Sequence, residues 1–274
     1  MTTSRAAMKL VNWRAAGIAV LALSAPLVAR GAPLAASGGS STAQPATLVV
    51  SVAASMHAAV EEIAVLYRAA TGVTVSLNTG GSNTLARQIV AGARAAVFLS
   101  ADERQMDVVE RAGRVVPGTR THLLTNELAI VAPRGSMAPA NLAALLEGRV
   151  TRLAMGEPNS VPIGVYGRRW LEHEGAWARL QSKVIPLPTP QAVLSAVEAG
   201  RVEAGIVYAT DAREANVRVV GRVPAKEHPY LNIVQPAAVI AGPAEAEGRQ
   251  FLQFLQGPAA RAVFTRRGFG LSER

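Results

Sequence analysis

Hydrophobic residues follow two alternating periods along most of the chain, one typical of strands and one typical of helices. Residues 48–52 form a short apolar run typical of a buried strand, and Val60, Ile63 and Tyr67 then recur at helical spacing before Gly72. The same order predicts strands at 48–52, 73–77, 96–100, 127–132, 152–155, 183–186, 204–208 and 231–241, and helices around 60–67, 85–89, 103–112, 142–146, 165–173, 191–199, 244–255 and 259–267. This alternation predicts an α/β fold of two units, each with a mostly parallel sheet flanked by helices, in which the chain end returns to the first unit.

The first part of the chain has a different character. Arg5, Lys9 and Arg14 precede an apolar run over 15–28, and small residues rich in Gly and Ser follow over 35–41. This order predicts a secretory signal peptide and flexible leader over residues 1–43, cleaved between about 36 and 43, because the apolar run is too short for a stable membrane span. The chain has no cysteine, which excludes a lipid-anchored cysteine after the signal. We therefore expect a periplasmic protein that is soluble and has no lipid anchor.

The formal net charge of +9 includes four cations of the leader, Arg5, Lys9, Arg14 and Arg30. The remaining cations are scattered rather than gathered in one stretch. Together with the export signal, this distribution argues against a nucleic-acid partner.

Two short serine turns are the most informative feature of the exported part. Ser55 lies in the turn 53–56 and Ser82 in the turn 80–84, and neither turn contains a charged residue. Each turn follows a predicted strand and opens a predicted helix, where backbone N–H groups lack intrahelical partners. The pattern predicts a site that offers neutral donors to an oxyanion, although each serine alone could equally be a helix N-cap. Tyr208, at the end of a predicted strand, is a further donor that could reach such a cleft.

Enzymatic and metal chemistry find little support in the sequence. The turn 80–84 resembles the G-x-S-x-G elbow of hydrolases but ends in Thr84, and the four histidines, His57, His122, His173 and His228, show no ligand spacing. The phosphate-binding G-x-x-x-x-G-K-[ST] motif is also missing from the sequence. A secreted serine hydrolase that uses Ser82 stays as an alternative, and the favoured prediction is not an enzyme.

Several motifs, taken together, resemble the periplasmic molybdate-binding protein of ABC transporters. They span nearly the whole exported chain, in order: Val52-Ala53-Ala54-Ser55, Ser82-Asn83-Thr84-Leu85-Ala86-Arg87-Gln88-Ile89, Phe98-Leu99-Ser100-Ala101-Asp102, Gly156-Glu157-Pro158 with Val161-Pro162-Ile163-Gly164, Gly205-Ile206-Val207-Tyr208 with Thr210-Asp211, and Gly257-Pro258 with Arg267-Gly268-Phe269-Gly270. The resemblance implies a two-lobed type II periplasmic binding protein that holds its oxyanion between the lobes. It implies a first lobe of residues 47–126 and 233–274 and a second lobe of residues 127–232.

The resemblance also implies which residues contact the oxyanion. Carried over by motif, they are the hydroxyls of Ser55, Ser82 and Tyr208, the amide of Ile163 and the position of Pro190, all as contacts to molybdate oxygens and none as a direct metal ligand. Proline has no N–H, so Pro190 cannot supply the amide that relatives have there. We expect Thr189 or Gln191 to supply a compensating donor.

A site made only of donors favours one class of anion. It satisfies a fully ionised tetrahedral dianion, whereas hydrogen phosphate would bury an O–H group without an acceptor, at a cost of about 1–3 kcal/mol. This chemistry fits the resemblance, which implies capture of molybdate or tungstate, without a cofactor, by a monomer that delivers the ion to an ABC permease. A protein of the same fold for sulfate or a small organic anion stays as an alternative.

Overall fold

The computed structural model describes residues 47–136, 142–224 and 226–272. The predicted signal peptide and leader, residues 1–43, lie outside them. Within these ranges, the structure contains no helix with the length and apolar composition that a bilayer crossing requires.

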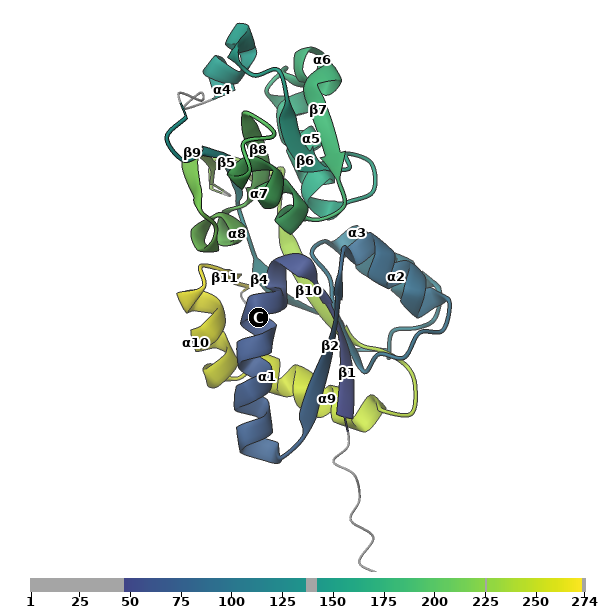
Figure 1. The fold of residues 1–274 in the computed structure, drawn as a ribbon. Helices are drawn as coiled ribbons and strands as arrows, with labels where there is room; N and C mark the ends of the chain where they lie inside the picture. Colours follow the sequence, from purple (N-terminus) through teal and green to yellow (C-terminus); the bar gives the residue numbers. More distant parts are fainter. Residues whose placement is uncertain (1–46, 137–141, 225, 273–274) are drawn as a thin grey trace, which may run out of the picture. The chain divides into compact units, whose positions relative to one another are not determined.

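Six strands form the first sheet, in the order β11-β4-β10-β3-β1-β2 (Figure 1). Its strands are β1 (Thr47–Ala53), β2 (Thr74–Gly80), β3 (Val97–Leu99), β4 (Thr121–Thr125), β10 (Val234–Val239) and β11 (Gly270–Leu271). Its helices are the 3-10 turn η1 (Ala54–Met56), α1 (His57–Thr71), α2 (Ser82–Val90), α3 (Glu103–Arg111), α9 (Glu245–Leu255) and α10 (Pro258–Arg266). The predicted apolar stripe of α1 is buried, and Gly72 ends this helix with a φ of 76°, a left-handed conformation that glycine adopts without a steric penalty.

Five strands form the second sheet, in the order β7-β6-β8-β5-β9. Its strands are β5 (Leu128–Pro133), β6 (Leu153–Gly156), β7 (Val184–Leu187), β8 (Ala204–Tyr208) and β9 (Val217–Val223). The helical segments between them are α4 (Leu142–Ala144), the π-helical turn η2 (Leu145–Arg149), α5 (Pro162–His173), α6 (Trp177–Leu180), the 3-10 turn η3 (Gln181–Lys183), α7 (Pro190–Glu198) and α8 (Ala209–Glu214).

The prediction of an α/β fold with two sheets flanked by helices is confirmed, although both sheets are mixed rather than mostly parallel. In the first sheet β1 is parallel to β2 and β3, but β10 runs antiparallel to β3 and β4. In the second sheet β6 is parallel to β7 and β8, but β5 runs antiparallel to β8 and β9. The reason lies in the connections: β5 and β10 each enter from the other sheet rather than through a strand-helix-strand crossover, so they need not be parallel to their neighbours.

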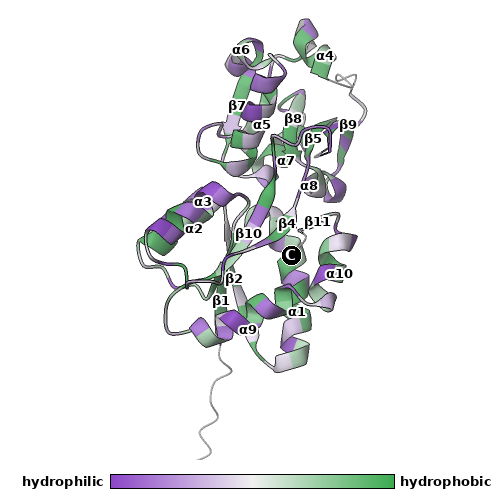
Figure 2. Ribbon diagram, turned by 180° about the vertical axis from the view of Figure 1, so that it is seen from behind, coloured by the Kyte–Doolittle hydropathy of each residue, from purple (hydrophilic) through white to green (hydrophobic). Residues whose placement is uncertain are grey.

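The hydrophobic cores lie between the sheets and their helices. The central strand β8 is buried along its whole length, whereas α3 buries Met106 and Val109 and exposes polar residues, which Figure 2 shows as alternating colours along the helix. The carboxyl ends of β1, β2, β6 and β8 lead directly into the turns that hold the candidate site.

Candidate functional site

One small cavity brings together all five residues whose positions the sequence predicts at the oxyanion. We call it the serine cavity; it is lined by Ala53, Ala54, Ser55, Gly80, Gly81, Ser82, Ala101, Val161, Pro162, Ile163, Pro190 and Tyr208. Its volume, counted as the space open to the centre of a water-sized sphere, is about 10 Å³. That is below the size of pockets for drug-sized ligands, so the cavity suits a group of a few atoms.

Ser55 brings a buried hydroxyl without any partner to the serine cavity. It lies within η1, whose N-cap is Ala53, and α1 begins two residues later with Met56 as its N-cap; neither cap uses a side-chain hydrogen bond. The Ser55 Oγ is buried and has no hydrogen-bond partner within the described residues. Ser55 is therefore not a helix cap, and its hydroxyl has the unmet hydrogen-bonding capacity expected of a ligand group.

Ser82 is the first residue of α2 and is buried. The N-cap of α2 is Gly81 and no side chain caps the helix, so the N-cap interpretation also fails for Ser82. Its Oγ instead accepts a hydrogen bond of 2.9 Å from the backbone amide of Ala101. Ala101 follows β3 and lines the same cavity. It belongs to the motif of residues 98–102, but the sequence predicted no role for it.

The first turn of α5 presents Ile163 to the serine cavity. This helix begins at Pro162, three residues earlier than predicted, so Ile163 lies in the first turn, where backbone amides have no partner within the helix. The next residue must be glycine, because a Cβ on Gly164 would lie 2.2 Å from the carbonyl oxygen of Gly156. This close approach holds the start of α5 against the end of β6.

The first turn of α7 lies on another side of the serine cavity. Pro190 lines the cavity and is the first residue of the helix, and Thr189 caps the helix by accepting a hydrogen bond of 3.2 Å from the amide of Ala192. The side chain of Gln191 bonds to the carbonyl oxygen of Ala54 and to Asp211. Neither Thr189 nor Gln191 lines the cavity, so a compensating role for the Thr189 hydroxyl or the Gln191 amide stays a prediction.

Tyr208 ends β8 and is completely buried, with its hydroxyl 3.4 Å from the carbonyl oxygen of Ala101. Burial raises the pKa of Tyr208 well above its usual value, and the nearby Tyr166, Asp102 and Asp211 raise it further. The phenol is therefore neutral at physiological pH and keeps its proton as a hydrogen-bond donor.

Among the residues that the structure describes, none that lines the serine cavity is charged. The nearby carboxylate of Glu157 accepts hydrogen bonds from Ser160 and Asn159 of its own loop, which lower its pKa. Glu157 is thus occupied within its loop and does not line the cavity. The cavity offers hydroxyl and amide donors without a fixed positive charge and without a carboxylate acceptor.

The geometry gives no support to a serine hydrolase. All four histidines lie in the described part of the chain, and none lines the serine cavity. His57 contacts Thr79 and Glu61, while His122 lies 2.8 Å from Glu103. Because no histidine is placed to take a proton from Ser82, the hydroxyl has no general base.

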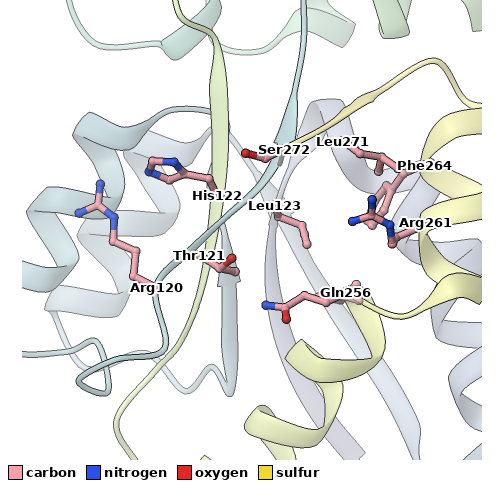
Figure 3. Close-up of a pocket in the computed structure, with 10 residues that line it drawn as sticks. Arg120, Thr121, His122, Leu123, Gln256, Arg261, Phe264, Leu271 and Ser272 are labelled. Atoms are coloured by element: carbon pink, nitrogen blue, oxygen red, sulfur yellow. The ribbon is translucent and has the colours of Figure 1, made fainter. Parts of the chain in front are cut away.

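A larger cavity lies elsewhere in the first sheet's unit and shares no lining residue with the serine cavity (Figure 3). Thr121, Gln256 and Arg261 line it from different elements, together with apolar side chains such as Leu123 and Phe264. No residue that the sequence singled out for binding lies there. Size alone therefore does not identify the functional site of this fold.

Comparisons with known proteins agree with this geometry. A model of the family described as bacterial extracellular solute-binding protein matches residues 48–270. The chain is 37% identical over 239 residues to the molybdate-binding protein ModA of Escherichia coli, covering 84% of this chain and 91% of that protein.

Solved structures also share the fold, among them the following two. One is the periplasmic molybdate-binding protein of Azotobacter vinelandii, with a TM-score of 0.72, 25% identity and coverage of 82% of this chain and all of that one. The other is the substrate-binding domain of a putative molybdenum ABC transporter of Clostridium difficile, with a TM-score of 0.65, 28% identity and coverage of 83% and 99%. With the family model matched over almost its entire described length, the chain belongs to the bacterial extracellular solute-binding proteins.

Proposed function

We propose that this protein captures molybdate or tungstate in the serine cavity and delivers it to an ABC permease. Like its family and its relatives, it is a binding protein and not an enzyme. The ion is cargo rather than a cofactor. The observation that carries the proposal is the buried, unpartnered Oγ of Ser55 in a small cavity without charged residues. A buried hydroxyl without a partner is costly, and an oxyanion in the cavity would satisfy it.

The proposed ligand set consists of five positions, two in the unit of the first sheet and three in the unit of the second. The hydroxyls of Ser55, Ser82 and Tyr208 and the amide of Ile163 donate to the oxygens of the ion, while Pro190 makes van der Waals contact. Every donor is neutral, so the ion keeps its two negative charges and is held by hydrogen bonds to a charged acceptor, which are stronger than those between neutral groups.

The donor set separates molybdate from other tetrahedral anions. Hydrogen phosphate would bury an O–H group among donors, and the lost hydrogen bond costs about 1–3 kcal/mol, or one to two decades of affinity. Sulfate is fully ionised and passes this test, but it is a smaller tetrahedron and cannot reach all donors of a cavity that fits molybdate. Molybdate and tungstate have nearly the same size, and we propose both as ligands.

We also propose that binding closes two lobes, of residues 47–126 with 233–274 and of residues 127–232. The crossovers support this division, because the chain leaves the first sheet after Thr125 and returns with Val234. The amide of Asn126 donates to the carbonyl oxygen of Ile233 over 3.1 Å, so the two crossover segments are tied together where the lobes would hinge. The closed form is the one that we expect the permease to recognise.

We place the protein in the periplasm as a monomer that carries no lipid anchor and does not bind nucleic acid. The predicted export signal and the cysteine-free sequence support this placement. The Azotobacter relative is itself called periplasmic.

A calorimetric titration of the purified protein with molybdate, tungstate, sulfate and phosphate tests the function directly. We expect tight binding of the first two, binding of sulfate weaker by at least about tenfold, and no measurable binding of phosphate. Phosphate affinity comparable to that of molybdate would show that the site contains an acceptor and would refute the donor-only chemistry. Preferred binding of sulfate would assign the protein to the alternative within the same fold.

A further inference from the structure

Three polar contacts join the two sheets' units around the serine cavity. The Asn83 amide reaches the Ser160 hydroxyl over 3.4 Å, and the Tyr208 hydroxyl reaches the Ala101 carbonyl over 3.4 Å. The third, from Gln191 Nε2 to the carbonyl oxygen of Ala54, is 3.0 Å long and connects residues 137 positions apart. It is the shortest of the three, and its donor, the side chain of Gln191, makes a second hydrogen bond within its own unit.

The anchor of Gln191 is Asp211. The same Nε2 atom donates to Asp211 Oδ1 over 3.3 Å, and Asp211 is 8% exposed. An amide nitrogen has two hydrogens, so one can serve each acceptor. The contact with Ala54 also fixes which way the amide faces, because the reversed orientation would place Oε1 against a carbonyl oxygen that can only accept. Both donors of the side chain are therefore committed to joining the Ala54 turn to α8.

The three residues of this connection each stand beside a residue of the serine cavity. Ala54 itself lines the cavity and immediately precedes Ser55, Gln191 immediately follows Pro190, and Asp211 lies three residues after Tyr208 on the helix that Tyr208 caps. A movement of the Ala54 turn away from α7 would therefore withdraw the Ser55 hydroxyl from the other donors. Pro190 has no N–H to donate to an ion. The first turn of α7 is nevertheless linked to the unit of the first sheet, through the side chain of Gln191 and the carbonyl oxygen of Ala54.

We propose that Gln191 is a positioning residue of the oxyanion site, which clasps the Ala54–Ser55 turn to α7 and α8 and so slows release of the bound ion. The inference rests on the proposed function and deepens it. In this role the side chain of Gln191 acts through Ser55 and does not itself touch the ion. If the lobes close on the ion as proposed, the clasp is made on closure, so we expect it to act on dissociation and to leave the encounter with the ion unchanged.

The variant Gln191→Met tests the clasp, because methionine has a similar length and lacks both donors. Gln191 is exposed and water competes for its hydrogen bonds, so we expect a modest effect: a dissociation rate for molybdate about threefold to tenfold higher, with an association rate unchanged within about twofold. Stopped-flow measurement of molybdate binding gives both rates. The exposed Gln253 on α9 provides the matched control, and Gln253→Met leaves both rates unchanged.

Two further variants separate the clasp from a merely structural role. Gln191→Glu keeps the shape but places a carboxylate oxygen against the carbonyl oxygen of Ala54, which can only accept, so it accelerates dissociation at least as much as Gln191→Met at pH 7. Asp211→Asn keeps an oxygen that accepts from Gln191, so its dissociation rate stays within about twofold of the wild type. Loss of thermal stability with unchanged rates in Gln191→Met would overturn the proposal and leave Gln191 a structural residue.

A second readout does not depend on the ligand. The chain has no cysteine, so spin labels at Ala93→Cys and Ala178→Cys, both exposed and one in each unit, report the distance between the units. We expect Gln191→Met to lower the closed fraction relative to the wild type, with and without molybdate. If the wild type binds no molybdate, the proposed function fails, while equal closed fractions in the two ligand-free proteins overturn the clasp.

Discussion

The backbone amide of Ala101 donates a hydrogen bond of 2.9 Å to the hydroxyl oxygen of Ser82. A serine hydroxyl has one hydrogen and two lone pairs, so this bond uses a lone pair and leaves the hydrogen for another acceptor. The two residues follow β2 and β3, and both line the serine cavity. The contact thus turns Ser82 into an oriented donor for an ion in that cavity.

Replacement of Ser82 changes both binding and stability. In Ser82→Ala we expect molybdate affinity to fall by about 1.5–3 kcal/mol, because the lost bond has a charged acceptor. The free energy of unfolding falls by about 1–3 kcal/mol, because the buried amide of Ala101 loses its acceptor. Calorimetry and urea unfolding measure the two effects, and the exposed Ser76→Ala is the control. Unchanged affinity in Ser82→Ala would remove this residue from the site.

Replacement of Ser55 separates binding from stability. The Ser55 hydroxyl is buried without a protein partner, so Ser55→Ala removes an unmet polar group from the ligand-free protein. We expect unchanged or slightly higher stability without ligand and a loss of about 1.5–3 kcal/mol in molybdate affinity. The same two measurements apply. A ligand-free protein destabilised by more than about 1 kcal/mol, with its affinity intact, would assign Ser55 to the fold rather than to the ligand.

Pro190 is the one predicted contact position that cannot donate. Valine restores the N–H at the first position of α7 without adding charge, while Thr189 still caps the helix. We expect Pro190→Val to tighten molybdate binding by about 1 kcal/mol, the contribution of one hydrogen bond. Pro258, also the first residue of a helix but remote from the serine cavity, provides the control Pro258→Val, with unchanged affinity. A substantial loss of affinity in Pro190→Val would show that the rigid ring shapes the cavity.

Elements with a continuous apolar run or a clear helical stripe could be predicted from the sequence, as β1, α1 and β8 show. The strand β9 could not, because its buried residues Val217, Val220 and Val223 are three apart instead of two. The cause is long-range: the pairing of β9 with β5 shifts register between Ile130 and Val131. The six-residue helix α8 was missed because it is too short to show a period.

The candidate site was predictable as a set of turns but not as a set of contacts. The resemblance placed Ser55, Ser82, Ile163, Pro190 and Tyr208 at positions that surround one cavity, while their role as ligands stays a prediction. Partners such as Ala101 for Ser82 and Ala54 for Gln191 are backbone groups of distant segments, which carry no sequence signal. These partners can be identified only when the folded chain brings the segments of residues 54 and 101 next to Gln191 and Ser82.

The stability of the protein should depend on pH through Asp102, which follows Ala101 and caps α3 by accepting a hydrogen bond of 3.0 Å from the amide of Gln105. Burial raises the pKa of this carboxyl to about 6 from its usual 3.8, which the bond to Gln105 offsets only in part. The folded state therefore favours the protonated form, and this contribution is fully present below about pH 4 and is lost as the pH rises through about 6.

We expect Asp102→Asn to remove this dependence, because asparagine stays neutral at every pH and remains a good N-cap. From pH 4 to pH 7 the wild type should lose on the order of 2–3 kcal/mol of unfolding free energy relative to the variant. Urea unfolding at pH 4, 5, 6 and 7 gives the difference in unfolding free energy between the wild type and the variant. All other carboxyl groups titrate in both proteins, so their contribution cancels in this difference. Parallel stability curves would mean that Asp102 is ionised in the folded protein at a normal pKa, stabilised by its cap bond to Gln105 against the cost of burial.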